Sequence, residues 1–293
     1  MTALPRQAIL VVNAMSRRGA DAFGEARDKL VAAGVDLIEA HAVDRPEAMG
    51  ETVRSAIGKA PMVIVGGGDG SLSESIDDFV GTDTIFALLP LGTANSFART
   101  MGIPLDLDGA TKVIANGRPL AIDLGKINDD YFLNNAAMGL APVVAETVPH
   151  GLKRKLGRLG YLVWAGWSAA SFRAFRLKVE KEGMVHRLWA TEVRIANGRF
   201  HGGVELIEKA DVESGEIIVQ AVRGRSLFRL AYNYASKLFK RSSGAEVREF
   251  HGRELKISTR PPMRVSIDGE LGPETPFTAS VAVAAVTIAA PRA

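Results

Sequence analysis

The sequence contains no cysteine among its 293 residues. This absence excludes a disulfide-stapled fold, a thiolate metal site, an iron–sulfur cluster and a cysteine nucleophile. Histidine is scarce as well: the five histidines lie far apart and form neither an H-x-x-H nor an H-E-x-x-H pattern, so a zincin-type metal site is not expected. The composition is otherwise that of an ordinary globular protein, because 47% of the residues are hydrophobic and 24% are charged.

Long hydrophobic runs are also missing. The two longest apolar tracts, 159–172 and 277–290, fall short of the ~18–20 residues that a membrane-spanning helix needs. Residues 1–7 do not have the pattern of a targeting signal. We therefore expect a soluble, cytoplasmic chain. Its length suggests two domains and is ample for a sizeable core.

Charge is distributed unevenly along the chain. Residues 1–146 hold 12 Lys and Arg against 19 Asp and Glu, whereas residues 147–293 hold 24 against 14. Two stretches, 152–178 and 223–241, carry much of the basic charge, contain no acidic residue and have apolar residues at helical spacing. Each stretch is either a basic amphipathic helix that lies on an anionic membrane or a core-facing helix with a solvated basic rim.

The order of expected strands and helices predicts two different architectures. Up to residue 123, apolar strands alternate with helical segments, which is typical of a mostly parallel α/β sheet covered on both faces. After residue 123, short strands joined by polar turns indicate an antiparallel sheet. We therefore predict a Rossmann-like α/β nucleotide-binding domain at 1–123 and a β-rich, sandwich-like domain at 124–280. The strand-like segment 281–293 could return to the first domain.

A glycine-rich loop follows the apolar strand 62–65. It consists of Gly66, Gly67, Gly68, Asp69, Gly70 and Ser71 and precedes a helical pattern. Glycines let backbone N–H groups approach an anion closely, and the following helix start adds partial positive charge, so the loop is suited to phosphate binding. Asp69 would then bind Mg²⁺, order the turn or accept a proton. The alternative is a plain strand-to-helix turn in which Asp69 caps the helix.

Two further turns carry polar groups. Gly92, Thr93 and Asn95 follow the next strand, and parallel strands end at the same edge of a sheet, so this turn is expected beside the glycine loop. Near the end of the chain, Asp268 and Glu270 come directly after a strand and could act as a general base and its supporting group. Taken alone, each turn also fits an ordinary loop, D-G being a common hairpin signal.

Taken in order, these motifs resemble the diacylglycerol kinase catalytic family, which includes sphingosine and ceramide kinases and bacterial lipid kinases. The family's G-G-D-G-T loop with a following N-E corresponds to 67–71 with Ser73 and Glu74, and its G-T-x-N-D-F-A-R corresponds to 92–99. Its N-P-x-S-G opening corresponds to the stretch that contains Asn13 and Ser16, and its D-G-E to 268–270. The match spans almost the whole chain. The family usually has Asn, Asp and Asp where this chain has Ser73, Ser96 and Ser214.

The resemblance implies an ATP site in the cleft between two domains and Mg²⁺-dependent transfer of the γ-phosphoryl group to a lipid hydroxyl. It assigns the nucleotide site to the glycine loop together with Asn13, Ser16, Glu74, Thr93 and Asn95. It assigns catalysis to Asp268, Glu270 and Asp69, and metal binding to Asp69 and Asp211.

The resemblance also bears on partners and location. It implies peripheral association with the inner membrane face through the basic stretches 152–178 and 223–241. We expect no nucleic acid partner, and a homodimer is one expected assembly. Two rival functions stay open at this point: an NAD kinase, whose family shares the G-G-D-G loop, and a catalytically silent module that binds lipid or nucleotide.

Overall fold

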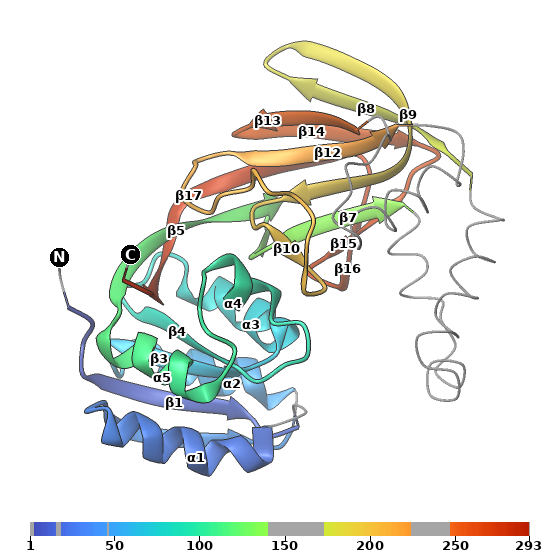
Figure 1. Ribbon diagram of the computed structural model, residues 1–293. Coiled ribbons are helices and arrows are strands. Elements are labelled where there is room, and N and C mark those ends of the chain that lie inside the picture. Colours follow the sequence, from blue (N-terminus) through green and yellow to red (C-terminus); the bar gives the residue numbers. More distant parts are fainter. Residues whose placement is uncertain (1–2, 16–18, 46, 140–172, 224–246, 293) are drawn as a thin grey trace. The chain divides into compact units, whose positions relative to one another are not determined.

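The computed structural model describes residues 3–15, 19–45, 47–139, 173–223 and 247–292. The chain forms two compact units (Figure 1). The N-terminal unit comprises Met1–Asn134, Asn197–Gly215 and Val281–Ala293, and the C-terminal unit comprises Asn135–Ala196 and Glu216–Ser280.

The N-terminal unit is built on a parallel sheet. Its strands are ordered β2-β1-β3-β4, with the end of β17 beside β4. The strands are β1 (Gln7–Asn13), β2 (Asp36–Val43), β3 (Met62–Gly67), β4 (Ile85–Pro90) and β17 (Phe277–Ala290). The helices are α1 (Gly19–Ala32), α2 (Ala48–Ala56), α3 (Asp69–Ile76), α4 (Ser96–Thr100) and α5 (Leu107–Asn116), with a 3₁₀ turn at Asp77–Phe79.

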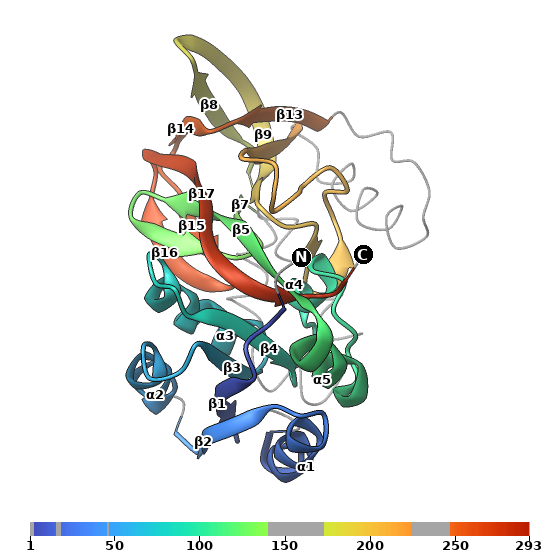
Figure 2. The ribbon, with the colours of Figure 1, turned by 90° about the vertical axis from the view of Figure 1, so that its left-hand side faces the viewer.

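Helices cover both faces of this sheet. Helix α1 packs with α5 on one face, and α2 packs with α3 on the other (Figure 2). Burial on both faces explains why β3 is an uninterrupted apolar run with every residue buried, and why the centre of β1 is equally apolar. The carboxyl ends of β1, β3 and β4 lead into the Asn13 turn, the glycine loop and the Gly92 turn. These three segments therefore meet at one edge of the sheet.

Shorter strands complete the N-terminal unit. Strand β5 pairs with β17 and with β6, and β10 pairs with β11 in a two-residue ladder. Their bounds are β5 (Arg118–Ile127), β6 (Asp130–Phe132), β10 (Phe200–His201) and β11 (Val204–Glu205).

The C-terminal unit is an antiparallel sheet assembly. Its strands are ordered β16-β15-β7-β9-β8-β14-β17, and β12 lies between β9 and β13. The strands are β7 (Asn135–Gly139), β8 (Phe175–Lys181), β9 (Met184–Ala196), β12 (Ile217–Arg223), β13 (Val247–Gly252), β14 (Glu254–Arg260), β15 (Arg264–Ile267) and β16 (Glu270–Glu274). Along β8 and β14, buried residues alternate with exposed or half-buried ones, as expected for strands with one core-facing side.

The structure corrects one secondary-structure prediction. The stretch 152–178 was expected to be a helix throughout, but Arg176 and Lys178 lie on strand β8. Cross-strand pairing on both sides of β8 decides this conformation, because β9 and β14 each form a ladder with it. The remainder of that stretch up to residue 172, and almost all of the second basic stretch, lie outside the described residues. Within the parts of the chain that the structure describes, no helix is long and apolar enough to span a bilayer.

The unit boundary lies after Asn134, eleven residues beyond the expected boundary at 123, and 197–215 belongs to the N-terminal unit rather than to the second domain. Hydrogen bonds explain the difference. The Asn197 side-chain amide donates to the carbonyls of Asp123 (2.9 Å) and Leu133 (3.0 Å), which ties 197–215 to β5 and to the segment after β6. The last segment, from Val281 onward, also belongs to the N-terminal unit: Ile288 of β17 pairs with Phe86 of β4.

Candidate active site

The glycine loop and the Gly92 turn touch each other through their backbones. A Cβ atom placed on Gly92 would lie 2.4 Å from the Cα atom of Gly68, which is closer than real Cβ contacts come. A Cβ atom on Gly68 would meet the Cα atom of Gly92 at 3.2 Å. Only residues without side chains allow this approach. The two loops therefore form one continuous backbone surface at the edge of the sheet.

Asp69 joins the same two loops through its side chain. Its Oδ1 atom accepts a hydrogen bond from the Phe97 backbone N–H at 3.1 Å, in the first turn of α4. This geometry supports a role in ordering the turn, one of the three expected for Asp69. A carboxylate near the start of a helix is also favoured by the helix dipole. Asp69 thus fixes the position of α4 relative to the glycine loop.

Asn95 shapes the second turn from within. It adopts a left-handed backbone conformation with φ +48°, which Asn tolerates better than most residues. Its Oδ1 atom accepts from the Gly92 N–H (2.9 Å), and its Nδ2 atom donates to the carbonyls of Gly92 (3.1 Å) and Pro90 (3.3 Å). The side chain is buried. These three contacts hold the turn, so Asn95 contributes to the site through the backbone that it positions.

Asn13 connects the end of β1 to the glycine loop. Its Nδ2 atom donates to the Ser71 hydroxyl at 2.9 Å, and its Oδ1 atom accepts from the Met15 N–H at 3.0 Å. Ser71 lies in the first turn of α3, and the N-cap of that helix is Gly68, which has no side chain to cap it. A Cβ atom on Gly70 would meet nothing within 4 Å. The start of α3 is thus open on the side where Gly70 lies.

The remaining predicted nucleotide-site residues have different positions. Thr93 is exposed on the Gly92 turn. Glu74 is exposed on α3, where its side chain lies beside Gly50 of α2: a Cβ atom on Gly50 would be 3.3 Å from Glu74 Oε1. Ser16 lies outside the described residues. The structure therefore brings Asn13, the glycine loop, Thr93 and Asn95 to one sheet edge, and places Glu74 toward α2.

Asp268 and Glu270 lie in the C-terminal unit, at the turn between β15 and β16. Asp268 (φ +45°) and Gly269 (φ +102°) both adopt left-handed conformations, as a tight two-residue hairpin turn requires. The Asp268 N–H donates to the Asn135 carbonyl (3.0 Å), and Asp268 Oδ1 accepts from the Asn135 N–H (3.1 Å). This double contact with β7 holds a half-buried carboxylate, while Glu270 is exposed beside it.

Asp123 is a further buried carboxylate, which the sequence reasoning did not include among the site residues. It is 3% exposed. Its Oδ2 atom accepts from the Gly215 N–H (2.6 Å) and its Oδ1 atom from the Ala284 N–H (2.8 Å). Two backbone hydrogen bonds offset much of the cost of burying the charge. Asp123 therefore ties three separate segments of the N-terminal unit together.

Asp211 lies at a turn that is stabilised by hydrogen bonds from the residues directly after it. Its Oδ1 atom accepts from the Glu213 N–H (3.0 Å), and its carbonyl accepts from the Ser214 hydroxyl (2.7 Å). It lines a cavity of about 360 Å³ in the N-terminal unit together with three arginines, namely Arg118, Arg199 and Arg292. Among the residues that the structure describes, no three His, Asp or Glu side chains gather as a metal-binding group. Metal binding by Asp211 stays a prediction.

Two sequence families match most of this chain. Residues 7–127 match the family described as "Diacylglycerol kinase catalytic domain". Residues 135–290 match the family described as "YegS C-terminal NAD kinase beta sandwich-like domain". The boundary between the two matches falls close to the boundary after Asn134 that the contacts give.

Several known proteins are similar to the chain. It is 30% identical over 212 residues to a "Probable lipid kinase YegS-like" protein of Klebsiella pneumoniae (strain 342), covering 71% of this chain and 70% of the relative. It is 26% identical over 268 residues to a diacylglycerol kinase of Staphylococcus epidermidis (strain ATCC 12228 / FDA PCI 1200), covering 85% and 80%.

A crystal structure titled as a diacylglycerol kinase from Bacillus anthracis str. Sterne superposes with a TM-score of 0.77 at 21% identity, covering 99% of this chain and 98% of that one. At this identity the likeness concerns the fold. The predicted fold class, an α/β domain followed by a β-sandwich-like domain, is confirmed, and so is the resemblance stated above.

Proposed function

Because this chain belongs to the lipid kinase family that includes the YegS-like lipid kinases and the diacylglycerol kinases, we propose that it transfers the γ-phosphoryl group of ATP to a hydroxyl group of a membrane lipid. The acceptor that we propose first is diacylglycerol, and a ceramide or sphingoid lipid is the second choice. The use of ATP with Mg²⁺, the acceptor and the residue roles below are parts of this proposal.

The observation that carries the proposal is the joined backbone surface of the glycine loop and the Gly92 turn. Backbone N–H groups at the start of α3 and the positive end of its dipole attract phosphate oxygens. The open space beside Gly70 leaves room for a phosphate to approach. We therefore assign the ATP phosphates to this edge, with Asn13 holding Ser71 and Asn95 holding the second turn.

The residues at this edge are compatible with a nucleotide-bound Mg²⁺. In phosphate-binding sites, Mg²⁺ is usually held by one or two carboxylates together with the substrate phosphates, so a full cage of protein ligands is not required. Asp69 is the carboxylate at this edge, and the ion would neutralise charge on the transferred group. Asp69 also keeps the two loops together through the Phe97 N–H.

For the acceptor hydroxyl we propose Asp268 as the general base and Glu270 as its supporting group. Asp268 is held at a fixed place by Asn135 and is only half-buried, so its carboxylate is both oriented and accessible. A general base must lie within hydrogen-bond reach of the proton that it accepts, whatever its pKa. Phosphoryl transfer itself depends mainly on positioning and charge neutralisation.

We further propose peripheral association with the cytoplasmic face of the membrane, to which the basic stretches 152–178 and 223–241 would contribute. A lipid substrate requires such contact, and basic segments are attracted to anionic headgroups. We propose no nucleic acid partner, and a homodimer stays a proposal.

The test is transfer of labelled γ-phosphate from Mg·ATP to mixed micelles of diacylglycerol, ceramide, a sphingoid base or phosphatidylglycerol, with a lipid-free arm that contains NAD. We expect a labelled lipid. In Asp268→Asn, which can keep the Asn135 contact and the left-handed turn, turnover should fall about 10²- to 10⁴-fold, the range of general base catalysis. Glu274→Gln, an exposed residue of the same hairpin that pairs with Arg264, is the matched control and should retain activity.

The other arms decide between the alternatives. Label in NAD without lipid would replace the lipid kinase with an NAD kinase, the enzyme named in the description of the C-terminal family match. ATP binding without any labelled product would favour the silent module. Asp69→Asn keeps an acceptor for the Phe97 N–H but loses the charge, so a loss of turnover at unchanged melting temperature would assign the charge of Asp69 to catalysis.

A further inference from the structure

Strands β8, β9 and β14 present one exposed face on which basic residues stand directly opposite each other. Arg176 of β8 is paired with Arg260 of β14, and Lys178 of β8 is paired with Arg187 of β9. Lys256 and Trp189 complete this set. We call these six residues the basic face: Arg176, Lys178, Arg187, Trp189, Lys256 and Arg260. All of them lie in the C-terminal unit.

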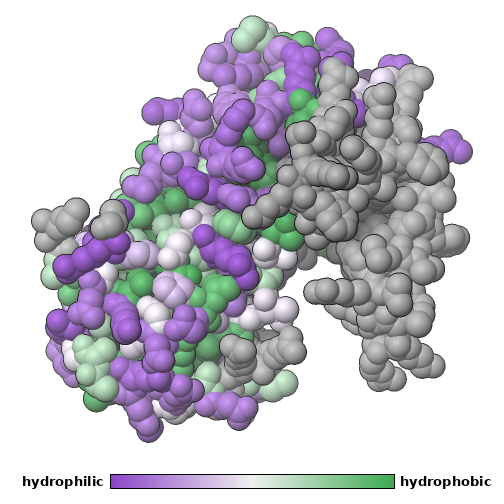
Figure 3. Space-filling view, viewed as in Figure 1, coloured by the Kyte–Doolittle hydropathy of each residue, from purple (hydrophilic) through white to green (hydrophobic). Residues whose placement is uncertain are grey.

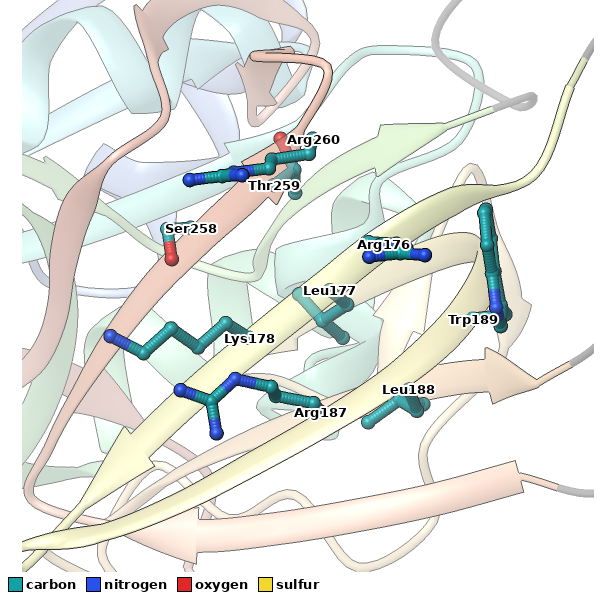
Figure 4. Close-up of a pocket in the computed structure, with 9 residues that line it drawn as sticks. All are labelled: Arg176, Leu177, Lys178, Arg187, Leu188, Trp189, Ser258, Thr259 and Arg260. Atoms are coloured by element: carbon teal, nitrogen blue, oxygen red, sulfur yellow. The ribbon is translucent and has the colours of Figure 1, made fainter.

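All residues of the basic face except Lys256 line a groove of about 610 Å³ (Figure 4). Lys178 and Arg187 lie side by side at one end of the groove, and Arg176 lies beside the Trp189 ring at the other, with its guanidinium carbon 5.2 Å from the ring centroid. In the space-filling view, hydrophilic side chains gather where Figure 1 shows β8 and β9 (Figure 3).

This arrangement costs stability. Like charges directly opposite each other on neighbouring strands repel, and opposite charges would stabilise the same ladder. Two carboxylates lie on this side of the strands. Glu180 hydrogen-bonds Lys178 and is paired with Lys256 of β14, and the exposed Glu254 lies two residues before Lys256. That hydrogen bond, followed by the attraction of Lys178, Lys256 and Arg187, lowers the pKa of Glu180. Lys256 stands opposite Glu180, whereas Arg176, Arg187 and Arg260 each stand opposite another basic residue. A bound polyanion would remove the repulsion within these like-charged pairs.

The opposite face of the hairpin is already covered within the unit. His186 of β9 packs against Phe250 of β13, with ring centroids 5.1 Å apart, and its Nδ1 atom lies 3.0 Å from Arg248 Nη2. Leu177 and Leu188 are buried. Among the described residues of the unit, the basic face is therefore the side of the β8–β9 hairpin that is left open to an external partner.

Size and apolar content indicate which anion fits. Strand spacing and rise give three strands and three rows an extent of about 10 Å by 13 Å, too wide for one phosphate group to contact both ends. Val185, on the same face two residues before Arg187, is 39% exposed, and Met184 at the hairpin tip is 55% exposed. Basic residues with a tryptophan and exposed apolar side chains are typical of surfaces that lie at the headgroup level of a bilayer.

We propose that the basic face docks on the surface of an anionic phospholipid membrane, with the arginines and lysines on headgroup phosphates and Trp189, Val185 and Met184 at the interface. This inference rests on the proposed function, because a kinase for membrane lipids must reach the bilayer. It adds a docking surface formed by three strands to the two basic stretches predicted above.

The test is co-sedimentation of the full chain, without ATP, with vesicles of phosphatidylcholine alone or of phosphatidylcholine mixed with phosphatidylglycerol. We expect binding to the anionic vesicles only, weakened by added salt. Arg176→Gln with Arg187→Gln removes one member of each like-charged pair. Because one basic residue near an anionic surface contributes about fivefold in binding, the double variant should bind about 25-fold more weakly. Its melting temperature should change little, because the relief of repulsion offsets the loss of the Arg176 contact with the Trp189 ring.

The matched control is Arg27→Gln with Arg253→Gln, which makes the same change in net charge at exposed positions outside the basic face. Equal losses in the two double variants would overturn the proposal, since only total charge would then matter. Saturable binding of soluble glycerol phosphate that protects against vesicle binding would point instead to a single free-phosphate site. Tight RNA binding lost in the first variant would replace the membrane with a nucleic acid.

The outcome is separable from that of the kinase assay. Vesicle binding that depends on Arg176 and Arg187, in a protein that phosphorylates no lipid, would keep the basic face and remove the proposed function. Lipid phosphorylation by the parent protein, together with full vesicle binding by the double variant, would keep the proposed function and remove the basic face as the docking surface.

Discussion

In the N-terminal unit, the glycine loop and the Gly92 turn form one sheet edge, which we call the glycine edge. This edge and the basic face of the C-terminal unit are both suited to bind phosphate, but they are built in opposite ways. The glycine edge consists of backbone, and its loops approach until a single methyl group would collide, as at Gly92. The basic face consists of long side chains on an ordinary antiparallel ladder, where no close backbone approach is needed.

The two surfaces should therefore differ in their tolerance to substitution. A surface made of backbone loses its shape when side chains are added, whereas a surface made of side chains loses its ligand but keeps its fold.

Gly92→Ala should be strongly destabilising. The new Cβ would lie 2.4 Å from Gly68 Cα, and backbone cannot move away as a flexible side chain can. Overpacking of this kind costs about 1–3 kcal/mol, and we expect the upper end of that range in chemical denaturation.

Gly70→Ala is the matched comparison on the same edge. No atom lies within 4 Å of its new methyl group, and alanine favours helix over glycine by roughly 0.5–1 kcal/mol, so the protein should unfold at equal or higher denaturant. ATP affinity should nevertheless fall about tenfold, because the new methyl group would occupy the space through which we propose that a phosphate approaches the loop. A hydrogen bond to the phosphate would then be lost, and a lost hydrogen bond to a charged group costs about 1.5–3 kcal/mol. Normal ATP affinity in this variant would exclude Gly70 from the phosphate site.

Ser96→Ala tests a side-chain contact within the backbone-built region. The Ser96 hydroxyl, at the position where the family usually has Asp, accepts from the Gly203 N–H at 3.1 Å and is buried. Leaving that N–H without its acceptor should cost about 1–2 kcal/mol in denaturation. Ser214→Ala, at an exposed departure from the family pattern, should change stability by less than about 0.5 kcal/mol. Equal effects would show that the Gly203 contact contributes nothing measurable.

Glu180→Gln should have the smallest effect on stability and should improve binding by the basic face. Removing this carboxylate should strengthen binding to anionic vesicles about fivefold, as one unit of charge does. The pKa of Glu180 is lowered in the folded protein, so its stabilising contribution is present above the unfolded-state pKa and is lost as pH falls through the folded-state pKa. The variant and the parent should therefore converge in melting temperature toward acidic pH.

Local motifs explain most of what could be predicted from sequence. The glycine loop, the Gly92 turn and the Asp268 turn are each contiguous, and parallel strands bring the first two to one edge, so both their nature and their proximity were predictable. The roles of Asp69 and Asn95 were not, because a carboxylate or an amide can serve the backbone or the ligand equally well. The structure shows that both side chains bind backbone: Asp69 accepts from the Phe97 N–H, and Asn95 accepts from the Gly92 N–H.

The basic face was not predictable, because it depends on pairing between distant segments. Arg176 and Lys178 looked like part of a basic helix, since charge and apolar spacing upstream continued into them. Arg187 and Arg260 stood in segments without any motif. The ladder of β8 with β9 and β14 brings them together, and strand register cannot be read from one sequence.

Strand β17 has a consequence for how the protein is made. Its first residues pair with β14 in the C-terminal unit, while Ile288 near its end pairs with β4 in the N-terminal unit. During synthesis, the N-terminal sheet therefore cannot be completed until β17 has been translated, about 200 residues after β4. Long-range pairing of this kind slows folding and keeps the edge of β4 open in the growing chain.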